Sequence, residues 1–479
     1  MRPNIIFLLL DSFRSDKCYG KNKTSKTPNL DALIKDSVYF SNTIASADGT
    51  VLSLNSLFTG LFPFKTGIRA KKLQLRGENF IDVLKKKGYH VYVITPQSTY
   101  FSPLYDYENL DKNMCPKPDK PILVDRKENS QEIEIDPEFK EKKIFREKNF
   151  TGGEILSAGM GQKIVDILTS KEMKEPWFFY IHMLDLHWPH VVPSEFNNDN
   201  FGQSHYERVL SAVDYWLGKF LEKIDMNSTL FVLTGDHGHV IPVDNKDITA
   251  FEPDLTLGLN VGKNLMPKFT HGVGAKFFVG LRGMIRDIRL VKADKKLTSY
   301  DKRSRLPPFT FSLFDESIRI PLVFSGYGIS PKIISQQVRN VDIFPTIFDI
   351  IGLSNKKQTL HGKSMLPLFH GKKMKELPAY FHSLPYEKIS PDDIVGIRTS
   401  KLKYFRGSRD PKKNVNLYDL SKDPWENFNI AKEKPDLVNK MEQLLTEITT
   451  DNLPEYGIDE ISKKELAIIE KELKELGYM

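Results

Sequence analysis

Near its start the chain reads Ile5-Ile6-Phe7-Leu8-Leu9-Leu10-Asp11, a continuous apolar run that ends on a carboxylate. A run of this length without polar alternation is typical of a strand that is buried on both faces of a parallel sheet. Two later segments, Trp177–Met183 and Thr229–Thr234, repeat the pattern, and a segment with helical periodicity precedes each of them. Strands that alternate with helices predict an α/β fold with a mostly parallel sheet between layers of helices.

Other segments extend this alternation. The sequence predicts a helix over Asn29–Lys35, for which Pro28 is the first residue and Thr27 the cap, and a helix that ends at Gly88. Further strands are expected over Tyr89–Ile94 and Pro321–Ser325, a helix over Phe344–Ile351, a hairpin over Val395–Thr399 and Leu402–Phe405, and two late helices over Pro435–Ile448 and Ser462–Leu476.

The change of pattern near residue 390 predicts two parts. We expect a main α/β domain over residues 1–385 and a smaller α+β subdomain with a terminal helix over residues 386–479. Two segments interrupt the first part: a charged surface excursion over 117–148 and an insertion over about 241–310.

Composition excludes several classes of protein. The 479 residues are 40% hydrophobic and 27% charged, which is unlike a disordered, collagen-like or coiled-coil chain. No apolar run approaches the roughly 18 residues of a membrane span, and no secretory signal pattern is visible. The two cysteines, Cys18 and Cys115, are too few for a disulfide framework and lack zinc spacing. We therefore expect a cytoplasmic protein.

The basic charge is concentrated in one segment. Lysine and arginine exceed aspartate and glutamate by 69 to 62, or +7, and residues 275–305 alone hold ten basic residues against three aspartates. Such a segment is either a solvated face or a surface for an anionic partner, namely an anionic substrate, a lipid headgroup or, least expected, a nucleic acid.

Acidic and imidazole side chains follow the predicted strands. Asp11 follows the first strand, and Asp236 and His237 follow Thr229–Thr234. His182, Asp185 and His187 lie at or just after the strand between them. Because parallel strands end at one edge of a sheet, these groups are expected to converge there. They suit a divalent cation such as Mn²⁺, Zn²⁺, Mg²⁺ or Ca²⁺, although any one of them could be an ordinary polar residue at a strand end.

These residues belong to an ordered set of motifs. The set comprises Pro3–Asp16, Thr27-Pro28-Asn29-Leu30-Asp31, Ser56–Pro63, Thr234-Gly235-Asp236-His237-Gly238, Leu313–Leu322, Asp342–Thr346 and Leu417–Leu420. The chain resembles the sulfatase family of the alkaline phosphatase superfamily along almost its whole length. The resemblance implies an alkaline-phosphatase-like core, a smaller C-terminal subdomain, one or two divalent metals and hydrolysis of an ester of an oxyacid.

The resemblance also implies a nucleophile at the start of a helix, ten residues before Gly60, which is Thr50. A helix N-terminus would suit an anionic oxyacid, and the alternative is that Thr50 only caps the helix. The implied metal ligands are Asp11, Asp236, His237 and Thr50, and the implied catalytic residues are Thr50, His187 and His271. Arg14, His182, Asp185 and His239 are supporting candidates.

Several family features are missing. The window Thr50-Val51-Leu52-Ser53-Leu54 lacks the proline and arginine that accompany conversion of cysteine or serine to formylglycine, and oxidation of threonine would give a ketone. The sulfate-binding lysine and histidine are replaced within Thr95-Pro96-Gln97-Ser98, a later lysine is replaced near Thr310, and the usual aspartate pair is Asp11-Ser12. No formylglycine is therefore expected.

The remaining chemistry resembles that of the phosphodiesterase, phosphonate monoester hydrolase and phosphoethanolamine transferase branch. We expect a metal-dependent hydrolase or phosphotransferase that attacks a small-molecule, lipid or sugar phosphoric ester through Thr50. Two alternatives remain open: a sulfuric ester hydrolase that works without formylglycine, and a non-catalytic member that binds a polyanion through residues 275–305.

Overall fold

The computed structural model describes much of the chain from residue 2 to residue 453. The description leaves out residues 22, 68–78, 95–111, 114–155, 171, 188–189, 244–250, 252, 254–270, 306–312, 354–359, 384–392, 452 and 454–479, and the side chains of 112–113, 158 and 271–279. The expected excursion over 117–148 and helix over Ser462–Leu476 therefore lie outside the described residues, as do Thr95–Ser98, Cys115 and Thr310.

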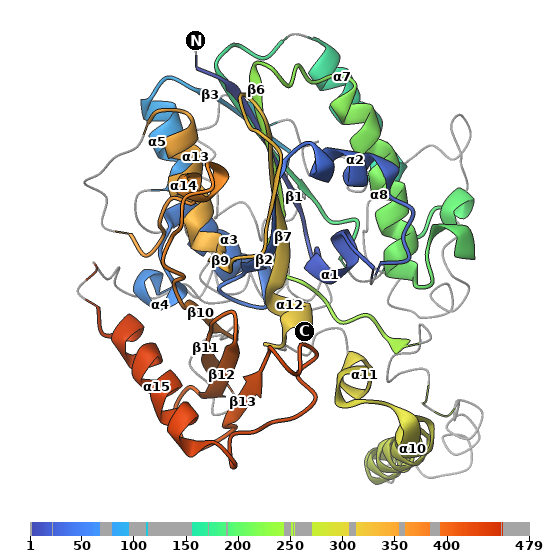
Figure 1. The fold of residues 1–479 in the computed structure, drawn as a ribbon. Helices are drawn as coiled ribbons and strands as arrows, with labels where there is room; N and C mark the ends of the chain where they lie inside the picture. Colours follow the sequence, from blue (N-terminus) through green and yellow to red (C-terminus); the bar gives the residue numbers. More distant parts are fainter. Residues whose placement is uncertain are drawn as a thin grey trace. The chain divides into compact units, whose positions relative to one another are not determined.

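A mixed sheet forms the core of the main part (Figure 1). Its strands in the described residues are β1 (Asn4–Leu10), β2 (Val38–Ile44), β3 (His90–Ile94), β4 (Lys112–Asn113), β5 (Trp177–Met183), β6 (Thr229–Gly235), β7 (Arg319–Gly326), β8 (Lys332–Ile334) and β9 (Val338–Arg339). Their order is β4-β3-β5-β1-β6-β7-β2-β8, and β9 pairs with β2. All pairs are parallel except those that β7 makes with β6 and β2. This confirms the predicted α/β fold with a mostly parallel sheet.

Helices cover both faces of the sheet (Figure 1). One face carries α3 (Thr50–Thr59), α5 (Phe80–Lys86), α13 (Ile343–Ile350) and α14 (Leu366–Phe369), and the other carries α2 (Pro28–Lys35), α7 (Met160–Ser170) and α8 (His205–Leu221). The segments that connect these elements contain three short helices: α1 (Ser15–Cys18), α4 (Pro63–Thr66) and α12 (Asp315–Ile318). The first face holds the largest apolar cluster, in which Phe58, Phe80 and Tyr180 pack ring against ring.

The C-terminal part is a small antiparallel sheet with one helix. Its elements are β10 (Ala379–His382), β11 (Ile394–Arg398), β12 (Leu402–Gly407), β13 (Asn416–Asp419) and α15 (Pro435–Thr449). Met441 and Leu445 of α15 pack on this sheet beside Tyr404. The expected hairpin is present as β11 and β12. Because β10 begins at Ala379, part of this sheet precedes the predicted boundary at 385/386, which stays a prediction.

The chain divides into two compact units. One comprises Met1–His239, Phe311–Pro424 and Asn429–Met479, and the other comprises Val240–Thr310 with Trp425–Phe428. The second unit contains the predicted insertion and holds α10 (His271–Ala293) and α11 (Ser299–Ser304). Among the helices of the described residues, none has the length and apolar character needed to span a membrane.

Candidate active site

Three neighbouring strands end at one edge of the main sheet. β1 lies between β5 and β6 and is parallel to both, so that Leu10 pairs with Met183 on one side and with Gly235 on the other. This edge is where α/β folds bind ligands. Three side chains meet there: Asp11, His182 and Asp236.

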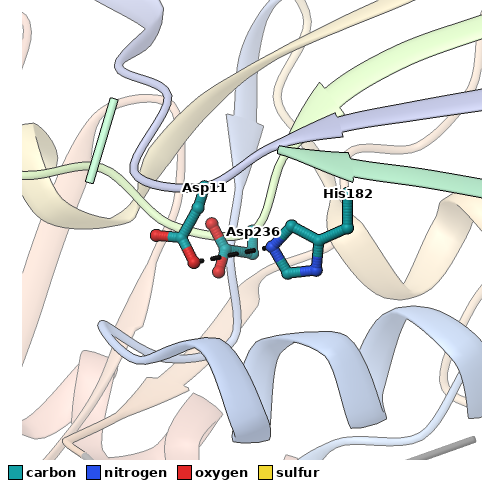
Figure 2. A group of neighbouring side chains, drawn as sticks. All are labelled: Asp11, His182 and Asp236. Carbon is teal, nitrogen blue, oxygen red and sulfur yellow. Dashed lines mark ion pairs between the residues drawn. The ribbon is translucent and has the colours of Figure 1, made fainter. Parts of the chain in front are cut away.

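The three side chains point toward one another (Figure 2). One ligand atom from each lies within 4.8 Å of the others, and His182 Nε2 is 3.5 Å from Asp11 Oδ2. All three residues are at most 1% exposed. The hydroxyl of Tyr180 lies 3.3 Å from His182 Nδ1, so an Nδ1–H that donates to this oxygen leaves the Nε2 lone pair facing the carboxylates.

These residues fit a divalent cation. Among the residues that the structure describes, none donates a hydrogen bond to the buried Asp236 Oδ2, and a buried carboxylate oxygen without a donor is costly unless a cation neutralises it. Two carboxylates and an imidazole are ordinary ligands of Mg²⁺, Mn²⁺ or Zn²⁺. His182 was predicted only as a supporting residue, and the structure places it within the cluster.

Thr50 lies beside this cluster at the start of α3. Its Oγ1 donates to Asp11 Oδ2 at 3.3 Å and lies 3.2 Å from His237 Nε2. Gly49 is the N-cap and Thr50 is the first helical residue, so Thr50 does not cap the helix. The helix N-terminus favours negative charge at this point because its first N–H groups have no partner within the helix.

His237 is positioned by its own loop. Its ring nitrogen Nδ1 lies 2.7 Å from the carbonyl oxygen of Gly238, to which it can donate, and Nε2 lies 3.4 Å from Asp236 Oδ2 and 3.7 Å from Asp11 Oδ1. Burial acts to lower the pKa of His237, but the carboxylates of Asp236 and Asp11 outweigh it and raise the pKa. The group of carboxylates therefore attracts positive charge.

The two carboxylates titrate in opposite directions. Burial acts to raise the pKa of Asp11, but the imidazoles of His187, His182 and His237 hold it well below its usual range. Burial and the negative charge of Asp11 raise the pKa of Asp236. Two buried carboxylates this close cannot both be charged at low cost without a cation.

Ser12, Ser53 and Asn340 hold the two aspartates in place through contacts to their carboxylates and to the main chain. Ser12 donates from its N–H to Asp236 Oδ1 at 3.1 Å and from its hydroxyl to Asp11 Oδ1 at 2.9 Å. On the other side, the Ser53 hydroxyl donates to the Asp236 carbonyl, and Asn340 Nδ2 donates to Ser53 Oγ at 3.1 Å. Asn340 was not predicted, because its distance of 287 residues from Ser53 leaves no local signal.

The remaining predicted residues have different surroundings. His187, half-buried in the turn after β5, lies near enough to Asp11 for its charge to lower the pKa of that carboxyl. Asp185 accepts from the Leu156 N–H at 3.0 Å, and burial raises the pKa of its carboxyl to about 7. His271 is the first residue of α10, and its side chain lies outside the described residues.

Arg14 and His239 contact each other in the segments that follow Asp11 and Asp236 along the chain. Arg14 donates from Nε and Nη2 to the two carboxylate oxygens of Asp16 and from Nη1 to the His239 carbonyl at 3.0 Å, so its contacts are structural. His239 faces the ring of His190, with ring centres 5.9 Å apart. Burial lowers the pKa of His190 to about 3, helped by His205 and His187. His190 was not predicted, although its spacing of three from His187 was a usable signal.

Two family models match the chain. The Sulfatase family model matches residues 3–353, and a model described as N-sulphoglucosamine sulphohydrolase, C-terminal, matches residues 299–451.

Individual proteins match along most of the chain. The chain is 24% identical to N-acetylgalactosamine-6-O-sulfatase of Bacteroides thetaiotaomicron over 94% of this chain and 93% of the relative. It is 23% identical to arylsulfatase K of Mus musculus over 93% of this chain and 79% of the relative. Among solved structures, phosphonate monoester hydrolase of Agrobacterium radiobacter has a TM-score of 0.63 at 17% identity, with 94% of this chain and 96% of that chain covered. A 2-O GAG sulfatase has a TM-score of 0.63 at 15% identity, with 97% and 96% covered.

Proposed function

Because the chain belongs to the sulfatase family, whose members hydrolyse ester bonds, we propose that it is a metal-dependent hydrolase or transferase of phosphoric esters, with Thr50 as nucleophile. Its substrates would be phosphodiesters or phosphonate esters of a small molecule, lipid or sugar. The observation that carries the proposal is the position of the Thr50 hydroxyl, which lies at the N-terminus of α3 within 3.3 Å of both Asp11 and His237.

The ligands of the cation in this proposal are Asp11, His182 and Asp236, with His237 and Thr50 beside them. Family members use divalent metal ions. When bound, such an ion lowers the pKa of a nearby hydroxyl and polarises an oxygen of the ester. Mn²⁺, Zn²⁺, Mg²⁺ and Ca²⁺ are the ions to be tested, because carboxylate and imidazole ligands accept all four.

The chain's own residues supply the rest of the chemistry. Thr50 Oγ1 forms a bond to phosphorus as the bond from phosphorus to the leaving oxygen breaks, and the lone pair of His237 Nε2, 3.2 Å from Oγ1, is in place to take the hydroxyl proton. His187, which follows β5 in the same unit as Thr50, returns a proton to the leaving oxygen. Water, or an acceptor alcohol in a transferase, then cleaves the phosphothreonine and restores the Thr50 hydroxyl.

Threonine at this position favours a phosphoric ester over a sulfuric ester. Threonine cannot give the formylglycine aldehyde, and the lysine and histidine that bind sulfate in the family are replaced within Thr95-Pro96-Gln97-Ser98. A phosphonate monoester hydrolase shares the fold, which agrees with this substrate class. Sulfuric ester hydrolysis without formylglycine is the second candidate, since N-acetylgalactosamine-6-O-sulfatase and arylsulfatase K both match the chain along most of its length.

The test uses the full chain with each of the four metals. Nitrophenyl phosphate, bis(nitrophenyl) phosphate, a phenylphosphonate ester and nitrophenyl sulfate are the substrates. We expect metal-dependent cleavage of a phosphorus ester, and loss of activity of at least about 10³-fold in Thr50→Ala, as for other essential nucleophiles. Thr59→Ala is the matched control, because Thr59 is a buried threonine at the opposite end of the same helix.

Three results would contradict the proposal. Equal activity of Thr50→Ala would remove Thr50 from the mechanism. Preference for the sulfate ester would favour the second candidate. Absence of activity with all four metals bound would favour a non-catalytic polyanion-binding protein. Mass spectrometry of a quenched reaction adds a direct readout, since a phosphorylated peptide that contains Thr50 is expected only if the covalent step occurs.

A further inference from the structure

Helix α10 carries an unusual set of exposed apolar side chains. Met284, Ile288 and Val291 are 55%, 61% and 67% exposed. Their spacing of four and three residues places them on one face of the helix. Half-buried Leu281, three residues before Met284, lies on the same face. Large apolar side chains scattered singly on a surface need no explanation, but a row of them on one helix indicates an interaction surface.

Basic side chains flank this row. At about 100° per residue, Lys292, Arg289 and Arg282 lie about 40 to 120° around the helix from Ile288, all on the same side. All three are exposed, and Lys295 and Lys296 continue the positive surface in the next turn. The opposite flank carries Asp287, which pairs with Arg286 at 2.8 Å.

The combination identifies the partner. A row of apolar side chains beside a basic flank is the pattern of a helix that lies in the interface of an anionic membrane, with its apolar side chains among the lipids and its cations at the headgroups. A soluble polyanion or a nucleic acid would account for the basic flank but would leave the apolar row in water. Of these partners, a lipid surface accounts for both the charge of the segment and its apolar row.

We propose that residues 281–296, which comprise α10 from Leu281 onward and the 3-10 turn Asp294–Lys296 that follows it, are a docking element for the surface of a membrane that contains anionic lipids. The helix lies on the membrane and does not cross it, in agreement with the hydropathy of the helices in the described residues. The proposal is independent of Thr50 and of the reaction that the chain catalyses.

The test is flotation of the full chain with vesicles. Vesicles of phosphatidylcholine with phosphatidylglycerol are compared with vesicles of phosphatidylcholine alone, and we expect binding only to the anionic vesicles. The combined substitution Lys292→Gln, Lys295→Gln and Lys296→Gln is expected to weaken binding on the order of 100-fold, at about fivefold per charge. Lys372→Gln, Lys373→Gln and Lys412→Gln are the matched controls, because these lysines are also exposed but lie in the other unit.

The apolar row has its own variant and control. Met284→Ser, Ile288→Ser and Val291→Ser together are expected to reduce vesicle binding at least tenfold, whereas Ile333→Ser, which alters an equally exposed apolar residue elsewhere, should not. Thermal unfolding of each variant checks that its fold is kept.

The same variants are measured against soluble polyphosphate. Failure of the unchanged protein to bind anionic vesicles would overturn the proposal. The proposal would also be overturned if the apolar-row variant bound both the vesicles and polyphosphate as tightly as the unchanged protein does. The surface would then recognise a polyanion through charge alone.

Discussion

Substitution of Asp315 by asparagine tests how the C-terminal sheet is attached to the core. Asp315 begins α12, and its carboxylate accepts from Arg398 Nε at 3.0 Å, Arg398 Nη2 at 2.7 Å and Lys403 Nζ at 3.0 Å. Arg398 lies on β11 and Lys403 on β12. The two basic side chains are 4% and 0% exposed. The ion pairs therefore join an element of the main part to the antiparallel sheet in a buried position.

The expected loss of stability is large because two buried cations, those of Arg398 and Lys403, stay behind, together with the partly exposed Arg319, which lies 3.9 Å from the same carboxylate. Asparagine has nearly the same shape as aspartate, so packing is kept while the negative charge is lost. Removing one partner of a buried ion pair costs about 3–5 kcal/mol, since the remaining charge has no compensation. We expect Asp315→Asn to lower the free energy of unfolding by this amount. Exposed ion pairs contribute about 1 kcal/mol or less.

The assay is urea unfolding followed by intrinsic fluorescence and by circular dichroism. Asp199→Asn is the matched control, because Asp199 pairs with Arg208 at 2.6 Å but is 78% exposed. A second variant separates charge from packing. The Lys403 amine lies over the rings of Phe314 and Phe381, so a methionine fits there. When Lys403→Met is added to Asp315→Asn, the double variant should recover part of the stability that Asp315→Asn alone loses. A loss within about 1 kcal/mol of the Asp199→Asn value would refute the reasoning.

Three further predictions concern the site and its surroundings. Gly238→Ala should abolish ester hydrolysis, because an added Cβ would lie 2.1 Å from the Glu316 carbonyl oxygen and must displace the loop that carries His237. Unchanged activity of this variant would contradict the prediction and show that the loop can shift without harm to the site. As the pH falls from about 6.5 to 4, His361 is expected to cost the unchanged protein up to about 3 kcal/mol of stability in urea unfolding. His361→Gln should remove this loss. Burial lowers the pKa of His361 to about 4, so the unfolded chain binds the proton first, and protonation would also break the Phe62 N–H hydrogen bond to Nδ1; equal pH profiles would contradict this. Mn²⁺, Zn²⁺, Mg²⁺ or Ca²⁺ should raise the melting temperature of the unchanged protein, by an amount equivalent to about 2.7 kcal/mol of stability at a hundredfold excess over Kd, and a chelator should reverse this rise. Asp236→Asn should show little rise. An equal rise in that variant would place the ion elsewhere.

The strands that build the site could be predicted because they are buried on both faces. Each is a short apolar run, and the polar residues after such runs, Asp11 and Asp236, mark the edge where they end. The position of Asp11 and Asp236 at this edge of the sheet could be predicted from the place of each residue directly after its strand. The predicted bounds of β5 agree with the structure, and those of β1 and β6 differ by one residue.

His182 could have been ranked higher from strand periodicity. Successive side chains of a strand alternate between the faces of the sheet, so His182 continues the face of Phe178 and Tyr180. Asp11 and Asp236 continue the same face of their own strands, which α3 covers. An uninterrupted apolar run hides this alternation, so His182 was predicted only as a supporting candidate.

Other features have no local signal. β2 was not predicted, because Ser41 and Asn42 interrupt its apolar residues at the irregularity between Phe40 and Thr43. Its antiparallel pairing with β7 depends on contacts between residues almost 300 positions apart. The attachment of Asp315 to β11 and β12 is equally non-local. Periodicity describes how one segment is buried, but it does not identify the segment that buries it.

Ser12 links the departures of the sequence to the chemistry proposed for the site. Where the family has a second aspartate, Ser12 removes a charge but still orients both remaining carboxylates through its N–H and hydroxyl. It does so at a φ of 63°, a strained conformation for a residue with a side chain, and its carbonyl accepts from Tyr206 at 2.9 Å. Two carboxylates just balance a divalent cation, whereas a third would leave the ligands with excess negative charge. An anionic phosphoric ester would therefore approach Thr50 with less repulsion than at a site with three carboxylates.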